Sequence, residues 1–344
     1  MNKQPRSRTT MLILLLALTL SAGAFLVWLY PMVMVKSERE ATIRIPANAT
    51  REMVKDSLDR YMGPDFAGKV MQLARLRNVK IENRHGSYVI PEGSNALAAM
   101  RKLTSGAQTP VRITVNGFRS LPLLIERISR KMEFPADSLE NLLSDPIYMS
   151  QYGLTPEQAL ALFIDDTYEV YWTSSARETV DKIGETYRYF WSDSRKRQAE
   201  ELGLTPADVM TIASITDEET NDEAEKGKIG RLYINRLQNN MRLQADPTVR
   251  FAIGDFTIQR ITKADLKVES PYNTYLHHGL PPGPIRTTSY ATLKKILRSE
   301  PHSYLYMCAK EDFSGTHNFA SSYDEHLRNA ARYQNALDQR GITR

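Results

Sequence analysis

The chain passes from one long apolar run into segments whose apolar residues repeat with the period of a strand or of a helix. Residues 11–35 contain no charged side chain, and this length is sufficient for a helix that crosses a membrane. Residues 41–46 alternate apolar and polar side chains, which predicts a strand, and Met53, Val54 and Leu58 then follow at helical spacing. These changes of period divide the chain before any chemistry is considered.

The apolar run at 11–35 predicts a transmembrane anchor. Lys3, Arg6 and Arg8 precede it without an acidic residue, which favours a cytoplasmic tail at residues 1–10. The small residues at 22–24 resemble a signal-peptide cleavage site, but the apolar run continues well past them. We therefore expect an uncleaved, single-pass protein of the inner (cytoplasmic) membrane, with its C-terminal domain on the periplasmic or extracytoplasmic side.

Residues 41–116 have the pattern of a small α+β module, and residues 117–344 form a larger mixed α+β region. In the module, N-caps are expected at Thr50 and Ser94, and the predicted order is β-α-α-β-α-β. It contains no evident chemistry, which is typical of a binding or spacer module. The predicted fold class is therefore α+β with an N-terminal transmembrane helix.

Composition excludes several functional classes. The chain has 344 residues with 42% hydrophobic and 25% charged side chains, as expected for about two globular domains. Its net charge of +5 comes without a long basic block, which argues against nucleic acid as a partner. Cys308 is the one cysteine, so no intramolecular disulfide can form, and its place in a predicted strand indicates a core residue. Without a phosphate loop or a zinc motif, we expect no cofactor and no metal site.

The first candidate for chemistry is a helix predicted to begin at the N-cap Thr205 and to end near residue 220. It carries three consecutive acids, Asp217, Glu218 and Glu219, and helical geometry places only Glu219 along the apolar stripe. Apolar surroundings raise the pKa of a carboxyl group, as a general acid requires. The alternative is that Glu219 caps a neighbouring turn or pairs with a buried arginine, either Arg231 or Arg236.

Further polar residues follow in loops and strands. Gln244, Asp246 and Thr248 alternate along a segment that we expect to be extended, which suits either a sugar polymer or a loop held by its own side chains. Tyr272 and Asn273 lie in a rigid Pro/Gly-rich stretch. His317 precedes a short strand, and a lone histidine is structural more often than functional. Tyrosine and arginine side chains also lie on the face of a predicted helix that would be buried, formed by Ile229, Leu232, Tyr233 and Arg236.

Six ordered motifs resemble the endolytic murein transglycosylase (YceG-like) family. They are Ala-Ser-Ile-x-x-x-Glu-Thr at 213–220, Tyr-Ile-Asn-Arg-Leu at 233–237, Met-Arg-Leu-Gln-x-Asp-Pro-Thr at 241–248, Tyr-Asn-Thr-Tyr at 272–275, Gly-Leu-Pro-Pro-Gly at 279–283 and Thr-His-Asn-Phe at 316–319. The anchor and a LysM-like module at 41–116 extend the resemblance to nearly the whole chain. One departure is Asp217, where the family signature has a glutamate.

The resemblance implies non-hydrolytic cleavage of the β-1,4 bond between N-acetylmuramic acid and N-acetylglucosamine in nascent peptidoglycan, leaving 1,6-anhydro ends. Glu219 would act as the single acid and then as the base. Substrate contacts are expected from Gln244, Asp246, Thr248, Tyr272, Asn273 and His317. The resemblance also suggests glycan-polymerising and penicillin-binding proteins as partners. Two alternatives remain at this point: a muramidase that uses a second carboxylate such as Asp246, and a wall-binding scaffold without activity.

Overall fold

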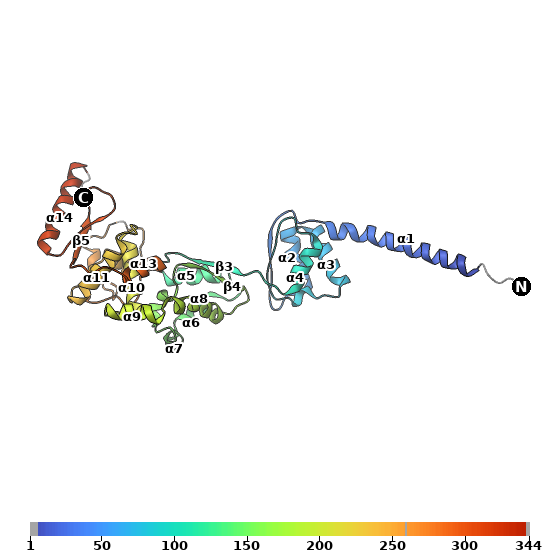
Figure 1. The fold of residues 1–344 in the computed structure, drawn as a ribbon, viewed down its shortest axis with the longest axis horizontal. Coiled ribbons are helices and arrows are strands. Elements are labelled where there is room, and N and C mark those ends of the chain that lie inside the picture. The colour runs from blue at the N-terminus through green and yellow to red at the C-terminus, as the bar shows by residue number, and fades with distance from the viewer. Residues whose placement is uncertain (1–5, 259, 342–344) are drawn as a thin grey trace. The chain divides into compact units, whose positions relative to one another are not determined.

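The computed structural model describes residues 6–258 and 260–341. The contacts between residues divide the chain into two compact units. The first extends to Val111 and includes Tyr171–Thr173, and the second contains Arg112–Val170 and the residues from Ser174 onward. Each unit has its own secondary structure, and the two are described separately (Figure 1).

The first unit begins with the helix α1, Arg6–Met34. Its segment Thr10–Met34 contains an 18-residue window with a mean hydropathy of 2.5 and no buried residue, and only the end of the helix, at Met32, packs into the core of this unit. By length and composition this helix could cross a membrane, as the charge-free run predicted, although a signal sequence has the same properties. The helix begins before residue 11 because the preceding polar residues continue its hydrogen bonding.

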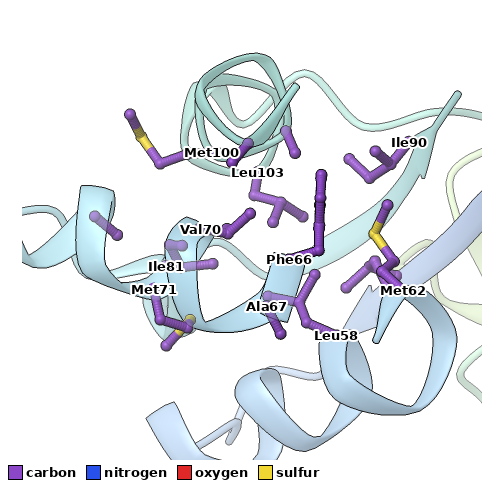
Figure 2. Packing of buried hydrophobic residues seen from close by; sticks show 14 of the residues in the cluster. Leu58, Met62, Phe66, Ala67, Val70, Met71, Ile81, Ile90, Met100 and Leu103 are labelled. Atoms are coloured by element: carbon purple, nitrogen blue, oxygen red, sulfur yellow. The ribbon is translucent and has the colours of Figure 1, made fainter. Parts of the chain in front are cut away.

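After α1, the first unit folds as a two-stranded antiparallel sheet covered by helices. Strand β1 (Ala41–Ile45) pairs with β2 (Gly86–Ile90), so that Ala41 lies opposite Ile90 and Ile45 opposite Gly86. The other elements are α2 (Arg51–Met62), α3 (Pro64–Leu76), the 3₁₀ turn η1 (Ile81–Asn83) and α4 (Ala96–Ser105). Figure 2 shows that Leu58, Phe66, Val70, Ile90 and Leu103 meet in one apolar cluster between these elements.

The predicted order of elements in residues 41–116 is observed, with one N-cap displaced. Thr50 caps α2 by accepting a hydrogen bond from the Met53 amide at 3.2 Å. The prediction of Ser94 as the next cap was wrong by one residue, because Asn95 accepts from the Ala98 amide at 2.8 Å. The third strand, β3 (Val111–Val115), pairs with β4 (Asp166–Val170) and takes no part in the β1–β2 sheet.

The second unit is mainly helical and is built around a buried central helix, α10 (Pro206–Glu219). Every residue from Val209 to Thr216 in α10 is buried, because α11, α12, α13, α9 and η2 all pack against it. The prediction of a single apolar stripe on this helix was therefore wrong: its small and hydroxyl-bearing residues are buried on all sides. Figure 1 shows α10, α11 and α13 close together in this unit.

The remaining elements of the second unit surround this centre. Before α10 come α5 (Leu121–Ser129), α6 (Ala136–Leu143), α7 (Pro146–Ser150), η2 (Pro156–Leu162), α8 (Ala176–Phe190) and α9 (Asp193–Glu201). After it come α11 (Lys226–Gln238), α12 (Asp246–Ile253), η3 (Asp265–Lys267), α13 (Tyr290–Leu297), the hairpin of β5 (Tyr306–Ala309) and β6 (His317–Ala320), and α14 (Tyr323–Gln339). Helix α14 packs on the hairpin.

Candidate active site

The position of the acids in α10 follows from how the helix begins. The Thr205 hydroxyl accepts from the Asp208 amide at 3.2 Å, and the Asp208 carboxylate accepts from the Thr205 amide at 2.8 Å. This reciprocal capping box, with Pro206 following the N-cap, confirms the predicted start of the helix. The phase of Asp217, Glu218 and Glu219 in the last turn is thereby fixed relative to the start of the helix.

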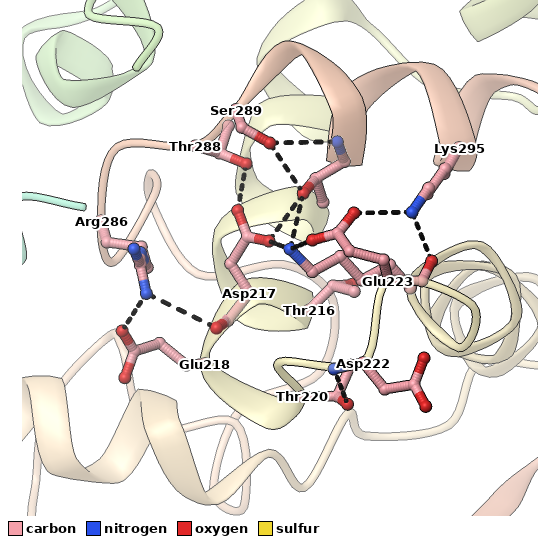
Figure 3. Close-up of polar contacts among 12 residues, drawn as sticks. Thr216, Asp217, Glu218, Thr220, Asp222, Glu223, Arg286, Thr288, Ser289 and Lys295 are labelled. Carbon is pink, nitrogen blue, oxygen red and sulfur yellow. Dashed lines mark hydrogen bonds and ion pairs between the residues drawn. The ribbon is translucent and has the colours of Figure 1, made fainter. Parts of the chain in front are cut away.

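Asp217 pairs with a lysine and accepts from two hydroxyls, of which Figure 3 shows that of Thr288. Its Oδ1 lies 2.9 Å from Nζ of Lys226, at the start of α11. Thr288 donates to its Oδ2 at 2.5 Å, and Thr292 donates to its Oδ1 at 2.7 Å, so α13 is attached as well. With its side chain only 6% exposed, Asp217 joins the end of α10 to two other helices, and it is not part of the cavity lining described below.

Glu218 is also buried, and two arginines neutralise it. Its Oε1 accepts from Nε of Arg119 at 2.7 Å and from Nη1 of Arg286 at 2.9 Å. The expectation that only one acid of the three points inward was therefore wrong, since Asp217 and Glu218 are both more than nine-tenths buried. What distinguishes the third acid is its set of partners.

Glu219 meets a phenol instead of a cation. The hydroxyl of Tyr233 donates to its Oε1 at 2.7 Å. Within the described part of the chain, no lysine or arginine forms an ion pair with this carboxyl group. Burial, together with the nearby charge of Asp246, raises the pKa of Glu219 to about 7, although the Tyr233 hydrogen bond acts in the opposite direction. Glu219 therefore titrates near neutral pH.

The alternative partners expected for Glu219 have other contacts. Arg236 donates to the carbonyl oxygens of Arg242 and Leu305 at 2.9 and 2.8 Å and to the Gln244 side chain at 2.6 Å. Arg236 is thus occupied in holding the loop before α12 and the strand β5. A pairing of Glu219 with Arg231 or Arg236 is not observed.

A cavity of about 400 Å³ opens in front of Glu219. Glu219 and Tyr233 line it together with an aromatic wall of Tyr306, Tyr323 and His326, in which the centroids of the stacked Tyr306 and His326 rings are 5.4 Å apart. Aromatic faces suit the C–H surfaces of sugar rings. The complete lining consists of Glu219, Leu232, Tyr233, Arg236, Leu243, Gln244, Asp246, Tyr275, Tyr306, Met307, Cys308, Ala309, His317, Tyr323 and His326.

Three of the predicted substrate-contacting residues meet Glu219 at this cavity. The side-chain oxygen of Gln244 accepts a hydrogen bond from Arg236, and the backbone of Gln244 is in the left-handed region with φ of 51°. Asp246, the first residue of α12, accepts from the Tyr275 hydroxyl at 2.6 Å. Nδ1 of His317 lies 2.8 Å from Oε2 of Glu225. The other carboxylate oxygen of Glu225, Oε1, accepts a hydrogen bond from the His317 amide.

The other three predicted residues do not line the cavity. Thr248 is fully buried, and its hydroxyl bonds with the Ala245 carbonyl and the Thr274 hydroxyl. Asn273 is fully buried and donates to two backbone carbonyls, and the Tyr272 ring packs on Phe251 at 4.6 Å. The prediction that residues 244–248 are extended was also wrong, because Pro247 lies in the first turn of α12.

Sequence reasoning missed several residues of the lining and misplaced one. Tyr233 was expected on a buried helix face without a role, and Arg236 on the same face only as a possible partner of Glu219, although every polar side chain on such a face requires a partner. Tyr275 was part of the motif at 272–275 but was not predicted as a site residue, and the aromatic residues Tyr306, Tyr323 and His326 were not predicted as site residues. Cys308 was predicted to be a core residue, but it is partly exposed at the cavity, because β5 belongs to a two-stranded hairpin that is open on this side.

The fold and the site define a mixed α+β protein with one carboxyl group that titrates near neutral pH in an aromatic-lined cavity. The sequence pattern of the YceG-like family matches residues 43–332, and the chain belongs to that family. A crystal structure of a YceG-like protein from Listeria monocytogenes has a similar fold, with a TM-score of 0.57 and 23% sequence identity, covering 85% of this chain and 99% of that one.

Two curated relatives match a shorter stretch. The endolytic murein transglycosylase of Bacillus subtilis (strain 168) is 35% identical over 132 residues, which is 38% of this chain and 36% of the relative. The endolytic murein transglycosylase of Streptococcus pneumoniae serotype 2 (strain D39) is 28% identical over 137 residues, which is 39% of this chain and 25% of the relative. The match thus spans about a third or less of these relatives.

Proposed function

We propose that this protein is an endolytic murein transglycosylase, with Glu219 as its general acid and then its base. The observation that carries the proposal is a carboxyl group whose pKa is raised to about 7 in a cavity lined by aromatic and polar side chains. Membership of the YceG-like family and relatives that carry this name support it. The substrate is then nascent peptidoglycan, cut at the bond between N-acetylmuramic acid and N-acetylglucosamine.

In the proposed reaction, protonated Glu219 gives its proton to the glycosidic oxygen while the bond from this oxygen to C1 of the muramyl residue breaks. The positive charge that develops at C1 is close to the carboxylate formed on Glu219 and to Asp246. The C6 hydroxyl of the same sugar then attacks C1, and Glu219 takes the hydroxyl proton. The products are a 1,6-anhydro end and a free 4-hydroxyl, and the acid is regenerated without water.

Substrate contacts are proposed for Gln244, Asp246 and His317, which face the cavity with hydrogen-bonding groups. The buried contacts of Thr248 and Asn273 support a different role for these two residues, in shaping the loops that carry Asp246 and Tyr275. Tyr272 supports α12 through its packing on Phe251. We therefore propose direct substrate contacts for three of the six expected residues.

A muramidase is the second candidate function, and Asp246 is the observation that favours it. Its carboxylate shares the cavity with Glu219, and its charge is close enough to raise the pKa of Glu219. Hydrolysis by inversion requires two carboxyl groups with room for a water molecule between them. In that case Asp246 would activate the water and the product would carry a reducing end.

We also propose the organisation of the whole chain. Residues 1–10 would be a cytoplasmic tail, residues 11–35 a transmembrane anchor, residues 41–116 a LysM-like module that holds glycan, and residues 117–344 the catalytic domain outside the inner membrane. The exposed apolar helix α1 supports the anchor. Glycan-polymerising and penicillin-binding proteins are proposed as partners, because they supply or use nascent strands.

The test is an analysis of products by mass spectrometry. The full chain in detergent is incubated with uncrosslinked, newly polymerised glycan. Anhydromuramyl ends are expected from a transglycosylase. Reducing ends would instead establish a muramidase, and intact glycan that remains bound to the protein would indicate a wall-binding scaffold.

A further inference from the structure

Tyr233 is the direct partner of the candidate acid. It lies in the middle of α11 with 2% of its surface exposed, and its hydroxyl is 2.7 Å from Oε1 of Glu219 at the end of α10. Helices α10 and α11 pack against each other, so the phenol cannot move away from the carboxyl group without disturbing the core. The contact is a built feature of two packed helices.

We propose that Tyr233 is a positioning residue that gives the two oxygens of Glu219 different tasks. Oε1 is held by the phenol throughout the reaction, and Oε2 carries the proton that is transferred. This inference rests on the proposed function for its meaning in catalysis, while the assignment of the two oxygens rests on the contacts of Tyr233.

The assignment follows from counting hydrogens. A phenol has one hydrogen, and a neutral carboxyl group has one as well. In the described part of the chain, Glu219 is the one hydrogen-bond partner of the Tyr233 hydroxyl, so the phenol hydrogen points to Oε1. If the carboxyl hydrogen were also on Oε1, the buried phenol hydrogen would lose its acceptor, which is costly. The proton of Glu219 is therefore placed on Oε2.

The phenol remains a donor in both states of the acid. Burial and the charge of Glu219 raise the pKa of Tyr233 well above its usual value, so it does not ionise near neutral pH. When Glu219 loses its proton, the same hydrogen bond becomes charge-assisted and stronger. Tyr233 thus favours departure of the proton from Oε2 and stabilises the carboxylate that must later act as a base.

The charged groups that shift the pKa of Glu219 lie on α12 and β6, while Arg236 on α11 and His326 on α14 line the same cavity. Asp246 on α12 raises the pKa of Glu219, whereas Arg250 on α12 and His317 on β6 lower it. Among the effects that lower this pKa, the Tyr233 hydrogen bond is the largest. Removing the phenol hydroxyl alone should therefore shift the titration of Glu219 upward.

The test uses the variant Tyr233→Phe, which keeps the ring and removes the hydroxyl. The full chain in detergent is labelled with ¹³C at glutamate carboxyl carbons and titrated by NMR, with Glu219→Gln to assign the signal. The pKa of Glu219 is expected to rise by about one unit in Tyr233→Phe. Tyr187→Phe is the matched control, because Tyr187 is buried and its hydroxyl has no hydrogen-bond partner among the described residues.

A second measurement does not depend on the folding of Tyr233→Phe. In the unmodified sequence, the phenolic ¹³C signal of Tyr233 should shift with a midpoint near pH 7, as Glu219 ionises, and this step should be absent in Glu219→Gln. An unaltered Glu219 titration in folded Tyr233→Phe, or a Tyr233 signal that does not follow Glu219, would overturn the proposal.

The activity measurement separates this inference from the proposed function. In Tyr233→Phe we expect kcat to fall about tenfold with KM unchanged, and the alkaline limb of the pH profile to move upward. A lower kcat with an unmoved pH profile would mean a merely structural role and would contradict the proposal. If the unmodified chain cuts no glycan, the proposed function fails, and the NMR titrations still decide the assignment of the two oxygens.

Discussion

Three neighbouring carboxyl groups at the end of α10 have three different sets of partners. Asp217 has Lys226 and two threonine hydroxyls, Glu218 has two arginines, and Glu219 has the phenol of Tyr233. A buried carboxyl group without a cation keeps its proton to higher pH than a paired one. The contrast between the three acids, more than burial alone, supports Glu219 as the proposed proton donor.

The raised pKa of Glu219 predicts how the reaction rate depends on pH. Cleavage requires the protonated acid, so kcat/KM should fall about tenfold per pH unit above a midpoint near 7. The measurement is the initial rate of glycan cleavage by the full chain between pH 5 and 9. A rate that stays constant up to pH 9 would show that Glu219 does not act as the acid.

The same pKa predicts an effect on stability. In the unfolded chain Glu219 has a pKa near 4.5, so the folded state holds its proton more tightly, and stability is lost as the pH rises from about 4.5 through 7. Glu219→Gln removes this loss. The unfolding free energy of Glu219→Gln minus that of the unmodified chain should therefore increase by up to about 3 kcal/mol when the pH rises from 4.5 to 8.

Urea unfolding at the two pH values measures this gain directly. Glu300→Gln provides the control, since Glu300 is exposed and its replacement should change stability equally at both pH values. If the unfolding free energies of Glu219→Gln and the unmodified chain differ by the same amount at pH 4.5 and at pH 8, a raised pKa of Glu219 is contradicted.

At the scale of elements, the end of α10 depends on ion pairs with other helices. Lys226 on α11 forms ion pairs with both Asp217 and Glu223, and its side chain is only 11% exposed. Removing one partner of a buried pair leaves an unpaired charge in the interior. The Lys226→Met variant should therefore lose about 3–5 kcal/mol of unfolding free energy.

Chemical denaturation measures this loss, and an exposed pair provides the comparison. Lys182 and Glu185 form an ion pair 2.7 Å long in which both side chains are more than half exposed. Lys182→Met should cost no more than about 1 kcal/mol. Equal effects of the two variants would argue against a structural role for the Asp217–Lys226 contact.

Much of the secondary structure could be predicted from the sequence, because caps and periodicity are local properties. Capping boxes at Thr205 and Ser175 stand directly at the starts of α10 and α8. The alternation of buried and exposed side chains in β1 lies within the strand itself. Helical phase placed Glu219 inside the protein, but it also placed Asp217 outside. The partners of Asp217 are Lys226, Thr288 and Thr292, which come from other segments of the chain. No local pattern therefore reveals that Asp217 is buried.

The cavity was only partly predictable for the same reason. Gln244, Asp246 and His317 were recognised as polar residues in loops or at strand ends. Thr248 and Asn273 have the same local appearance, yet their hydrogen bonds run to the loops around them. Whether a polar side chain faces a ligand or a neighbouring loop depends on tertiary contacts that the sequence does not display.

At the scale of the whole molecule, the apolar helix α1 decides where the protein acts. Its window Thr10–Met34 could serve as an anchor or as a cleaved signal. The proposed anchor predicts that the mature protein keeps this segment. Mass spectrometry of the intact protein extracted from membranes should therefore give the mass of the full chain, and a mature N-terminus near residue 25 would contradict the anchor.

The central claim is that Glu219 donates the proton that breaks the glycosidic bond, and one comparison tests it most directly. Glu219→Gln keeps the shape and the acceptor for Tyr233 but cannot donate an acidic proton. Purified full-length protein and this variant are given the same nascent glycan, and bound glycan and cleaved products are both measured. We predict undiminished binding and a loss of anhydromuramyl products of at least about 10³-fold; cleavage by Glu219→Gln at a rate close to that of the unmodified protein would contradict the account.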